Sequence, residues 1–322
     1  MTLATKATTP APAKWGNRDL AVWAAAIVIL VAAPFFFYPL FLAKVLVFAL
    51  FAAAFNLLLG SCGLLSFGHA AFYGAAAYVS AHAAKVWGLP FEVSVLLGVV
   101  TATGLGAVFG YLSIRRAGLQ FAMITLALAQ MIYFLALQLP FTHAEDGLTG
   151  VPRGNVLGLF PLDDLRTLYF TVAVIFVLGM LIIQRITNST FGQLLRAIRD
   201  NEPRAISLGY EAERFKLLAF VLSAGLAGLA GGTKAIAFKL ATLTDVHWST
   251  SGSVILMTLL GGLGTLWGPV IGALITVTLE DYLADTGLPI QAVIGGIFIL
   301  CILLFRRGVV GEIRNFIQPD GK

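Results

Sequence analysis

The sequence has few charged residues and almost no cysteine. Lys, Arg, Asp and Glu together make up 11% of its 322 residues, whereas hydrophobic residues make up 59%. Because about a quarter of the residues in soluble domains are charged, this composition excludes an ordinary soluble globular domain. The two cysteines, Cys62 and Cys301, lie far apart in apolar segments without CxxC spacing, so a structural disulfide is not expected.

The sequence also lacks the short motifs of nucleotide binding and catalysis. It contains no GxxxxGK[ST] loop, and residues 231–234, Gly-Gly-Thr-Lys, have the letters of that motif in the wrong order. It contains no GxSxG elbow for a nucleophilic serine. The histidines do not have the spacing of metal ligands; they are His69, His82, His143 and His247. We therefore expect no enzymatic activity, no catalytic residues, no metal site and no cofactor bound by this chain.

Long apolar runs are what the sequence has in abundance. Each run is about 20 residues long, enough for a helix to cross a hydrocarbon layer of about 30 Å. The runs are unbroken, whereas the strands of a membrane barrel would alternate apolar and polar residues. The sequence therefore predicts an all-α, polytopic transmembrane helix bundle of about eight to ten spans. The expected continuous spans are 20–38, 41–59, 64–86, 93–114, 119–139, 168–183, 217–238 and 289–305.

The segment 253–283 does not fit this scheme of single spans. It is long for one span and short for two, and glycines and Pro269 interrupt it. The charges on either side require it to enter and leave the membrane on the same side. We therefore expect a broken or re-entrant hairpin near 253–283.

Basic residues set the expected orientation and domain limits. The net charge of +5 suggests nucleic acid at first sight, but in a membrane protein basic residues gather in cytoplasmic loops, so no nucleic-acid partner is expected. We expect a cytoplasmic tail at 1–19 without a removed signal peptide, a transmembrane domain at 20–305 and a cytoplasmic tail at 306–322. Within the domain, 140–166 is expected to be an external loop and 184–216 a cytoplasmic loop. The protein would thus be multi-pass, in contact with membrane lipid and with both termini in the cytoplasm.

The cytoplasmic loop has the pattern of two short amphipathic helices. Ser189 and its neighbours are good N-cap residues, and Phe191, Leu194, Leu195 and Ile198 follow at helical spacing. Pro203 suits the first turn of a second helix that would end at Gly209. An ordinary solvated loop with snorkelling arginines is the alternative. The orderly caps and apolar stripe favour a docking element.

Four blocks of sequence carry a family resemblance. They are FGQLLRAIRDNEPRAISLGY at 191–210, KLLAFVLSAGLAGLAG at 216–231, LLSFGHAAFYG at 64–74 and GGLGTLWGP at 261–269. These blocks closely resemble the permeases of branched-chain amino-acid ABC importers, the LivM-like subfamily, and the resemblance covers nearly the whole chain after the N-terminal tail.

The resemblance implies a set of partners. Two permease subunits would form the path, here this chain and a second, different permease chain, although a homodimer stays open. Two cytosolic ATP-binding subunits would hold ATP and Mg, and a periplasmic protein would deliver the substrate. The location implied is the bacterial inner membrane. Carried onto this sequence, the loop would be the coupling helix seated on an ATPase, with Phe191, Leu194, Leu195, Arg196, Arg199, Glu202, Ala205 and Gly209 as its candidate residues.

Two further groups of residues are candidates inside the membrane. Ser66, Gly68, His69, Phe72 and Tyr73 are candidates for the translocation path, because polar side chains within a span face protein or a water-filled path. His69 is equally explained as a core histidine bonded to a neighbouring helix. Glycines recur every four residues and suit close helix packing; they are Gly264, Gly268 and Gly272.

The expected function is that of a permease subunit for branched apolar amino acids. Urea or another small organic solute is an alternative cargo for the same mechanism. An ion-coupled secondary transporter is the runner-up, but its expected marks, inverted repeats and buried acids near the midplane, are not evident. An intramembrane enzyme would need a clustered nucleophile, metal site or acid pair, and the spans contain none.

Overall fold

A computed structural model gives the fold of the chain. It describes residues 17–284 apart from 157 and 159, together with 293, 295, 296 and 299. The tail expected at 306–322 lies outside these residues, as do nearly all of the expected tail 1–19 and most of the expected span 289–305.

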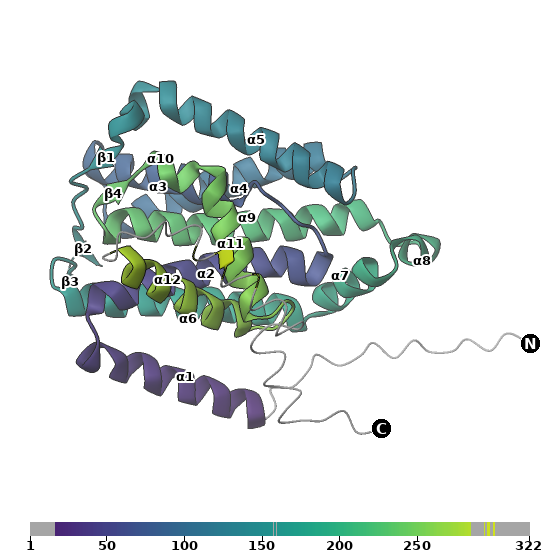
Figure 1. Cartoon of the computed structure of the whole chain (residues 1–322), viewed down its shortest axis with the longest axis horizontal. Coiled ribbons are helices and arrows are strands. Elements are labelled where there is room, and N and C mark those ends of the chain that lie inside the picture. The colour runs from purple at the N-terminus through teal and green to yellow at the C-terminus, as the bar shows by residue number, and fades with distance from the viewer. Residues whose placement is uncertain are drawn as a thin grey trace, which may run out of the picture.

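The described part of the chain is almost entirely helical (Figure 1). The helices are α1 Asn17–Phe36, α2 Pro39–Cys62, α3 His69–Lys85, α4 Phe91–Ser113, α5 Leu119–Gln138, α6 Leu165–Asn188, α7 Thr190–Asp200, α8 Glu202–Ser207, α9 Ala212–Ala237, α10 Leu243–Val246, α11 Trp248–Gly261 and α12 Gly268–Ala284. Two 3₁₀ turns lie between α5 and α6, at Pro140–Thr142 and Ala144–Asp146. Five helices are long and apolar enough to cross a membrane: α2, α4, α5, α6 and α9. The prediction of an all-α polytopic membrane bundle is confirmed.

Local sequence sets the ends of these helices. Pro39 begins α2, where the missing amide hydrogen of proline costs nothing, and Gly63 ends it with a left-handed φ of 71°. Asp164 caps α6, its carboxylate accepting a hydrogen bond of 3.2 Å from the Thr167 amide. The hydrogen bonds from the backbone and side chain of Thr167 lower the pKa of the Asp164 carboxyl.

The bundle is built around α2, α3 and α9. Helix α2 is the most buried of the five long helices, and it packs against α6, α9 and α12, while α3 packs against α4 and α9. Helix α1 lies apart at the edge of the bundle (Figure 1), where its Trp23 indole donates a 2.6 Å hydrogen bond to Gln184 of α6. The apolar core therefore runs through the centre of the bundle, and α1 and α5 form its margins.

The two ends of the bundle differ. One end, called here the strand end, carries two short antiparallel pairs: β1 Leu148–Thr149 with β4 Leu240–Ala241, and β2 Asn155–Val156 with β3 Phe160–Pro161. The opposite end, called here the α8 end, carries α7 and α8, and Figure 1 shows α8 projecting beyond the other helices. The expected external loop 140–166 lies at the strand end, and the expected cytoplasmic loop 184–216 lies at the α8 end.

A hairpin of two short helices follows α9, as the interruption near 253–283 predicts. Its first helix, α11, begins at Trp248, five residues before the expected start, and its second, α12, begins after the turn 262–267. Between α9 and α11 the chain runs mostly without helix into the bundle. There Val246 lies against Gly74 of α3, and near the start of α11 the Ser251 hydroxyl accepts a 2.8 Å hydrogen bond from the Ala70 amide. The hairpin is thus inserted between the long helices.

Glycines allow α9 to pack closely against both α3 and α4. A Cβ added at Gly231 of α9 would lie 2.0 Å from the Tyr73 carbonyl oxygen of α3, and one at Gly228 would lie 2.3 Å from the Cβ of Ala102 on α4. Lipid gives helices no hydrophobic reason to associate, so close packing of this kind holds a membrane bundle together.

We expect Gly231→Ala to destabilise the bundle, because the new methyl group would meet a backbone oxygen that cannot move independently. Overpacking of this kind costs about 1–3 kcal/mol of unfolding free energy. The measurement is unfolding of the detergent-solubilised protein. Gly104→Ala on α4 is the matched control, because a Cβ there would meet nothing within 4 Å. Equal stability of the two variants would contradict the proposed packing.

Candidate functional site

The segment between α6 and α9 folds into two short helices joined by a sharp corner. The Ser189 hydroxyl caps α7 by accepting a hydrogen bond of 3.3 Å from the Gly192 amide. The Asn201 side chain caps α8 in the same way, accepting 3.1 Å from the Arg204 amide. Gly209 follows α8 with a φ of 89°, a left-handed conformation that suits glycine. Local capping thus produces the projecting corner.

The apolar stripe predicted on α7 is turned toward the rest of the chain. Leu195 is fully buried and joins the main core, while Ile198 packs with Ala205 and Ala212 in a small separate cluster. Leu194 is partly buried against that cluster. In this conformation the stripe attaches α7 to the bundle and does not form a free surface.

The charged side chains attach the same element by hydrogen bonds. Arg196 donates 3.0 Å to the Thr187 carbonyl at the end of α6, and Arg199 donates 2.5 Å to the Gly60 carbonyl at the end of α2. Glu202 forms an ion pair of 2.6 Å with Lys216 of α9, whose side chain is only 8% exposed. Arginine near a helix C-terminus satisfies carbonyls that lack a helical partner. The element is therefore tied to α2, α6 and α9 at once.

The exposed apolar side chains of the element lie in α8 and just after it. Phe191 is partly buried and its ring lies 6.0 Å from that of Phe215, whereas Ile206, Leu208 and Tyr210 are 55%, 69% and 46% exposed. Sequence reasoning did not single out these three exposed residues. Their alternating spacing fits neither a helix face nor a span, and that misfit was the signal available. We call Ile206, Leu208 and Tyr210 the apolar tip. The coupling role of the eight predicted residues stays a prediction.

A polar cavity of about 380 Å³ lies beside this element. Arg196 and Arg199 line it together with the ends of α2 and α6 and the turn 262–267. Asn56 of α2 holds that turn, its amide donating 2.8 Å to the Thr265 carbonyl and its oxygen accepting 3.0 Å from the Gly264 amide. The hairpin turn and α7 therefore share one polar pocket at the α8 end.

His69, a candidate for the translocation path, is fully buried at the start of α3. Its Nε2 lies 2.8 Å from the Ser223 hydroxyl, which donates its one hydrogen to the Ala54 carbonyl at 2.6 Å. The hydroxyl must therefore accept from the ring, which assigns the hydrogen to Nε2 and leaves Nδ1 without a partner among the described residues. The aromatic rings of Phe55, Phe72 and Phe220 surround the imidazole. Here His69 joins α2, α3 and α9 in the core.

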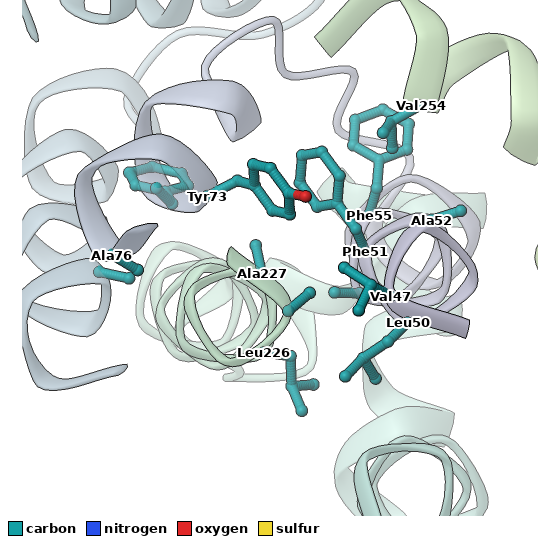
Figure 2. Close-up of a cluster of buried hydrophobic side chains, with 14 of the residues drawn as sticks. Val47, Leu50, Phe51, Ala52, Phe55, Tyr73, Ala76, Leu226, Ala227 and Val254 are labelled. Atoms are coloured by element: carbon teal, nitrogen blue, oxygen red, sulfur yellow. The ribbon is translucent and has the colours of Figure 1, made fainter. Parts of the chain in front are cut away.

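The other path candidates also lie inside the subunit. Tyr73 is fully buried, and its ring stacks on Phe51 with centroids 4.4 Å apart (Figure 2). Its hydroxyl has no hydrogen-bond partner among the described residues. Phe72 and Ser66 are fully buried too, and the Ser66 hydroxyl accepts 3.1 Å from the Gly68 amide. The structure brings these five residues together in the core, and their role in transport stays a prediction.

The three glycines predicted to form one packing face do not share a helix. Gly268 and Gly272 belong to α12 and face α11, where a Cβ on Gly272 would meet the Met257 carbonyl oxygen. Gly264 instead lies in the preceding turn with a φ of 72°. The turn must reverse the chain before α12 can start, so the expected continuous glycine face is wrong at Gly264.

A buried ion pair was missed by sequence reasoning. Lys234 near the end of α9 lies 2.6 Å from Asp245 of α10, with side chains only 13% and 9% exposed. Asp245 also accepts 2.9 Å from the Thr242 amide in a capping box. In the sequence this lysine stands out only as the last residue of 231–234, which has the letters of a phosphate loop in the wrong order. The two residues hold the inserted segment against α9.

Similarity to known proteins covers all five long apolar helices of the described chain. A family model described as "Branched-chain amino acid transport system / permease component" matches residues 38–305. The chain belongs to this family. The permease is thus a multi-pass membrane protein, and the prediction of its family from the four sequence blocks is confirmed. No solved structure matches it.

Curated relatives of the permease differ in the cargo that their names give. The high-affinity branched-chain amino acid transport system permease protein LivM of Escherichia coli (strain K12) is 24% identical over 288 residues, covering 82% of this chain and 68% of the relative. The autoinducer 2 import system permease protein LsrC of Salmonella choleraesuis is 27% identical over 239 residues, covering 66% of each chain.

We expect Lys234→Met to destabilise the permease strongly, because it leaves the Asp245 carboxylate buried without its partner. Breaking such a pair costs about 3–5 kcal/mol of unfolding free energy, and removing both charges in Lys234→Met/Asp245→Leu should recover part of it. Thermal unfolding in detergent measures both. The control is Lys239→Met, whose partner Asp163 is exposed, so that its loss should cost less than about 1 kcal/mol. A loss in Lys234→Met no larger than in the control would contradict the structural role of the pair.

Proposed function

We propose that the permease is the membrane subunit of an ATP-driven importer for branched-chain amino acids and has no ATPase site of its own. The match of the family model to residues 38–305 carries the proposal. The relative named for branched-chain amino acids covers more of the chain than the relative named for autoinducer 2, which supports the amino-acid cargo.

The α8 end would face the cytoplasm of a bacterial inner membrane. Basic side chains gather at this end, as they do in cytoplasmic loops; they are Arg115, Arg116, Arg185, Arg196, Arg199, Arg204, Arg214 and Lys216. The strand end would then face the periplasm, where a substrate-binding protein would deliver the amino acid. The N-terminus and C-terminus are proposed to lie in the cytoplasm.

The α7–α8 element is proposed to seat on one of two cytosolic ATP-binding subunits, which would hold ATP and Mg. The apolar tip would fill a groove of that partner, because exposed apolar side chains at the end of a rigid projection suit a docking pocket. Arg196, Arg199 and Glu202 would transmit the partner's movement through their bonds to α6, α2 and α9. A second permease subunit, of a different sequence, would complete the path.

A second cargo class has support from one observation. The similarity to a permease named for autoinducer 2 import extends over 66% of the chain. The same mechanism would then carry another small polar solute, for which urea is a further candidate. An ion-coupled secondary transporter acting alone has no such support.

The test is uptake of labelled leucine into liposomes that contain the permease, its candidate partner permease and the ATP-binding subunits, with binding protein outside and ATP inside. We expect vanadate-sensitive uptake that survives a protonophore. Uptake of urea or autoinducer 2 in place of leucine would change the cargo. Uptake by the permease alone, driven by a proton gradient, would overturn the proposal.

We expect Leu208→Glu to abolish leucine uptake in this system, because a carboxylate in the apolar tip would have to lose its water on docking. Uptake should fall by more than about tenfold, as for loss of an interface anchor, while unfolding of the isolated permease is unchanged. Leu208→Met is the matched control, since it keeps an apolar side chain at the same exposed position. Equal uptake by both variants would show that the tip does not dock.

A further inference from the structure

A group of polar side chains lies half-exposed on the outside of the bundle where α5 meets α10 and α11. The group consists of Gln130 and Tyr133 of α5, His247 between α10 and α11, and Ser249 and Ser253 of α11. We call it the polar face. The rings of Tyr133 and His247 lie 5.3 Å apart, and this contact joins the two sides of the face. In Figure 1, α10 and the start of α11 lie next to α5.

The polar face lies at a depth where lipid would be apolar. Gln130 is the twelfth of the 20 residues of α5, so at 1.5 Å per residue it lies about 16 Å from the start of a helix about 30 Å long. Its amide has no hydrogen-bond partner among the described residues, and neither has the Ser253 hydroxyl. An unpaired amide in hydrocarbon is unfavourable, so polar groups at this depth face protein or a water-filled path.

The backbone beside the face leads to the same conclusion. The chain between α9 and α11 enters the bundle with only one helical turn, α10. Irregular backbone at membrane depth is tolerated where it is buried in protein or lines a water-filled cavity. Val246 is buried against α3, but its neighbour His247 is half-exposed on the face. The irregular segment therefore reaches the surface at the face.

A buried hydroxyl behind the face lacks a partner as well. Tyr78 of α3 is only 2% exposed, and its hydroxyl has no hydrogen-bond partner among the described residues. Its helix, α3, packs against both α5 and α10 and so lies behind the contact between them. A buried hydroxyl without a partner is unfavourable, and a solute or water entering from the face would satisfy it.

The charges around the face select a class of ligand. The first amides of α11 are already bonded, that of Ser249 to the His247 ring and that of Thr250 to the His247 carbonyl. Among the described residues, the Gln130 amide and the Ser253 hydroxyl are free donors of the face, and they suit a carboxylate. Helices α5 and α11 contain no acidic residue that would repel it, and the Asp245 charge is neutralised by Lys234. Helices α5 and α11 contain no Lys or Arg either, so they offer no positive side chain to balance a substrate with a net negative charge. The arrangement suits the carboxylate of a zwitterion, and the exposed Met131 and Phe134 of α5 suit an apolar side chain.

We propose that the polar face lines the path taken by the substrate and that Gln130 and Ser253 donate hydrogen bonds to the carboxylate of a zwitterionic amino acid. This inference rests on the proposed function and assigns the substrate contact to residues outside 66–73. The second permease would close the path opposite the face.

Two experiments on the complete reconstituted transporter test the proposal. The first measures uptake of labelled leucine by Gln130→Leu and Ser253→Ala. We expect each to lose about tenfold in uptake rate, as for a lost hydrogen bond to a charged group, with unchanged unfolding. Gln120→Leu and Thr278→Val are the matched controls, because both side chains are exposed on α5 and α12 away from the face. If Gln130→Leu and Ser253→Ala transport as well as the controls, the carboxylate site is wrong.

The second experiment places Gln130→Cys or Ser253→Cys in a background with Cys62→Ala and Cys301→Ala. A charged methanethiosulfonate should label both positions, and leucine supplied with its binding protein should slow the labelling, whereas leucinol, which lacks the carboxylate, should not. Failure of both positions to label would show that the face is covered by lipid or by the partner permease, and would overturn the proposal. Uptake of another solute and no leucine by the unaltered transporter would contradict the proposed cargo. Labelling by the charged reagent would still decide whether the face lines a water-filled path.

Discussion

The need to pair every backbone polar group inside an apolar layer governs this structure. Helices meet that need within themselves, and most of the described chain is helical. The exceptions are the inserted segment before α11 and the turn 262–267. Each is held by a polar side chain from a neighbouring helix. The Lys234 ammonium of α9 donates 3.3 Å to the Leu240 carbonyl and pairs with Asp245, and Asn56 of α2 holds the turn. Two polar side chains of the spans, Lys234 and Asn56, thus support the backbone where it departs from helix.

The long spans could be predicted from the sequence because they depend on one local quantity, the length of an apolar run. Helices α4 and α5 lie within about two residues of their expected limits. The start of α11 could not be placed in this way. Its position depends on the contact of Val246 with Gly74, which lies far away in the sequence, and on the ion pair between Lys234 and Asp245.

The candidate sites were harder to predict than the spans for a related reason. Capping at Ser189 and Asn201 is local, so the double-helix loop was predictable. Whether Leu195 faces a partner or its own chain depends on where α2 and α6 end. The spacing of apolar residues in α7 gives no information about those positions. His69 is comparable: a histidine in a span could line a path, but its bond to Ser223 belongs to the packing of α3 on α9.

The attachment of α7 has a consequence for how force would travel through the molecule. Arg199 connects it to α2, Arg196 to α6, and Glu202 joins α8 to Lys216 of α9. A force applied at the tip of α8 would therefore be transmitted to three helices, α2, α6 and α9. Two of those helices, α2 and α9, are the ones against which α3 and the inserted hairpin are packed. A displacement at the tip would thus reach the middle of the bundle through α2 and α9, its two most buried long helices, and not through the marginal helices α1 and α5.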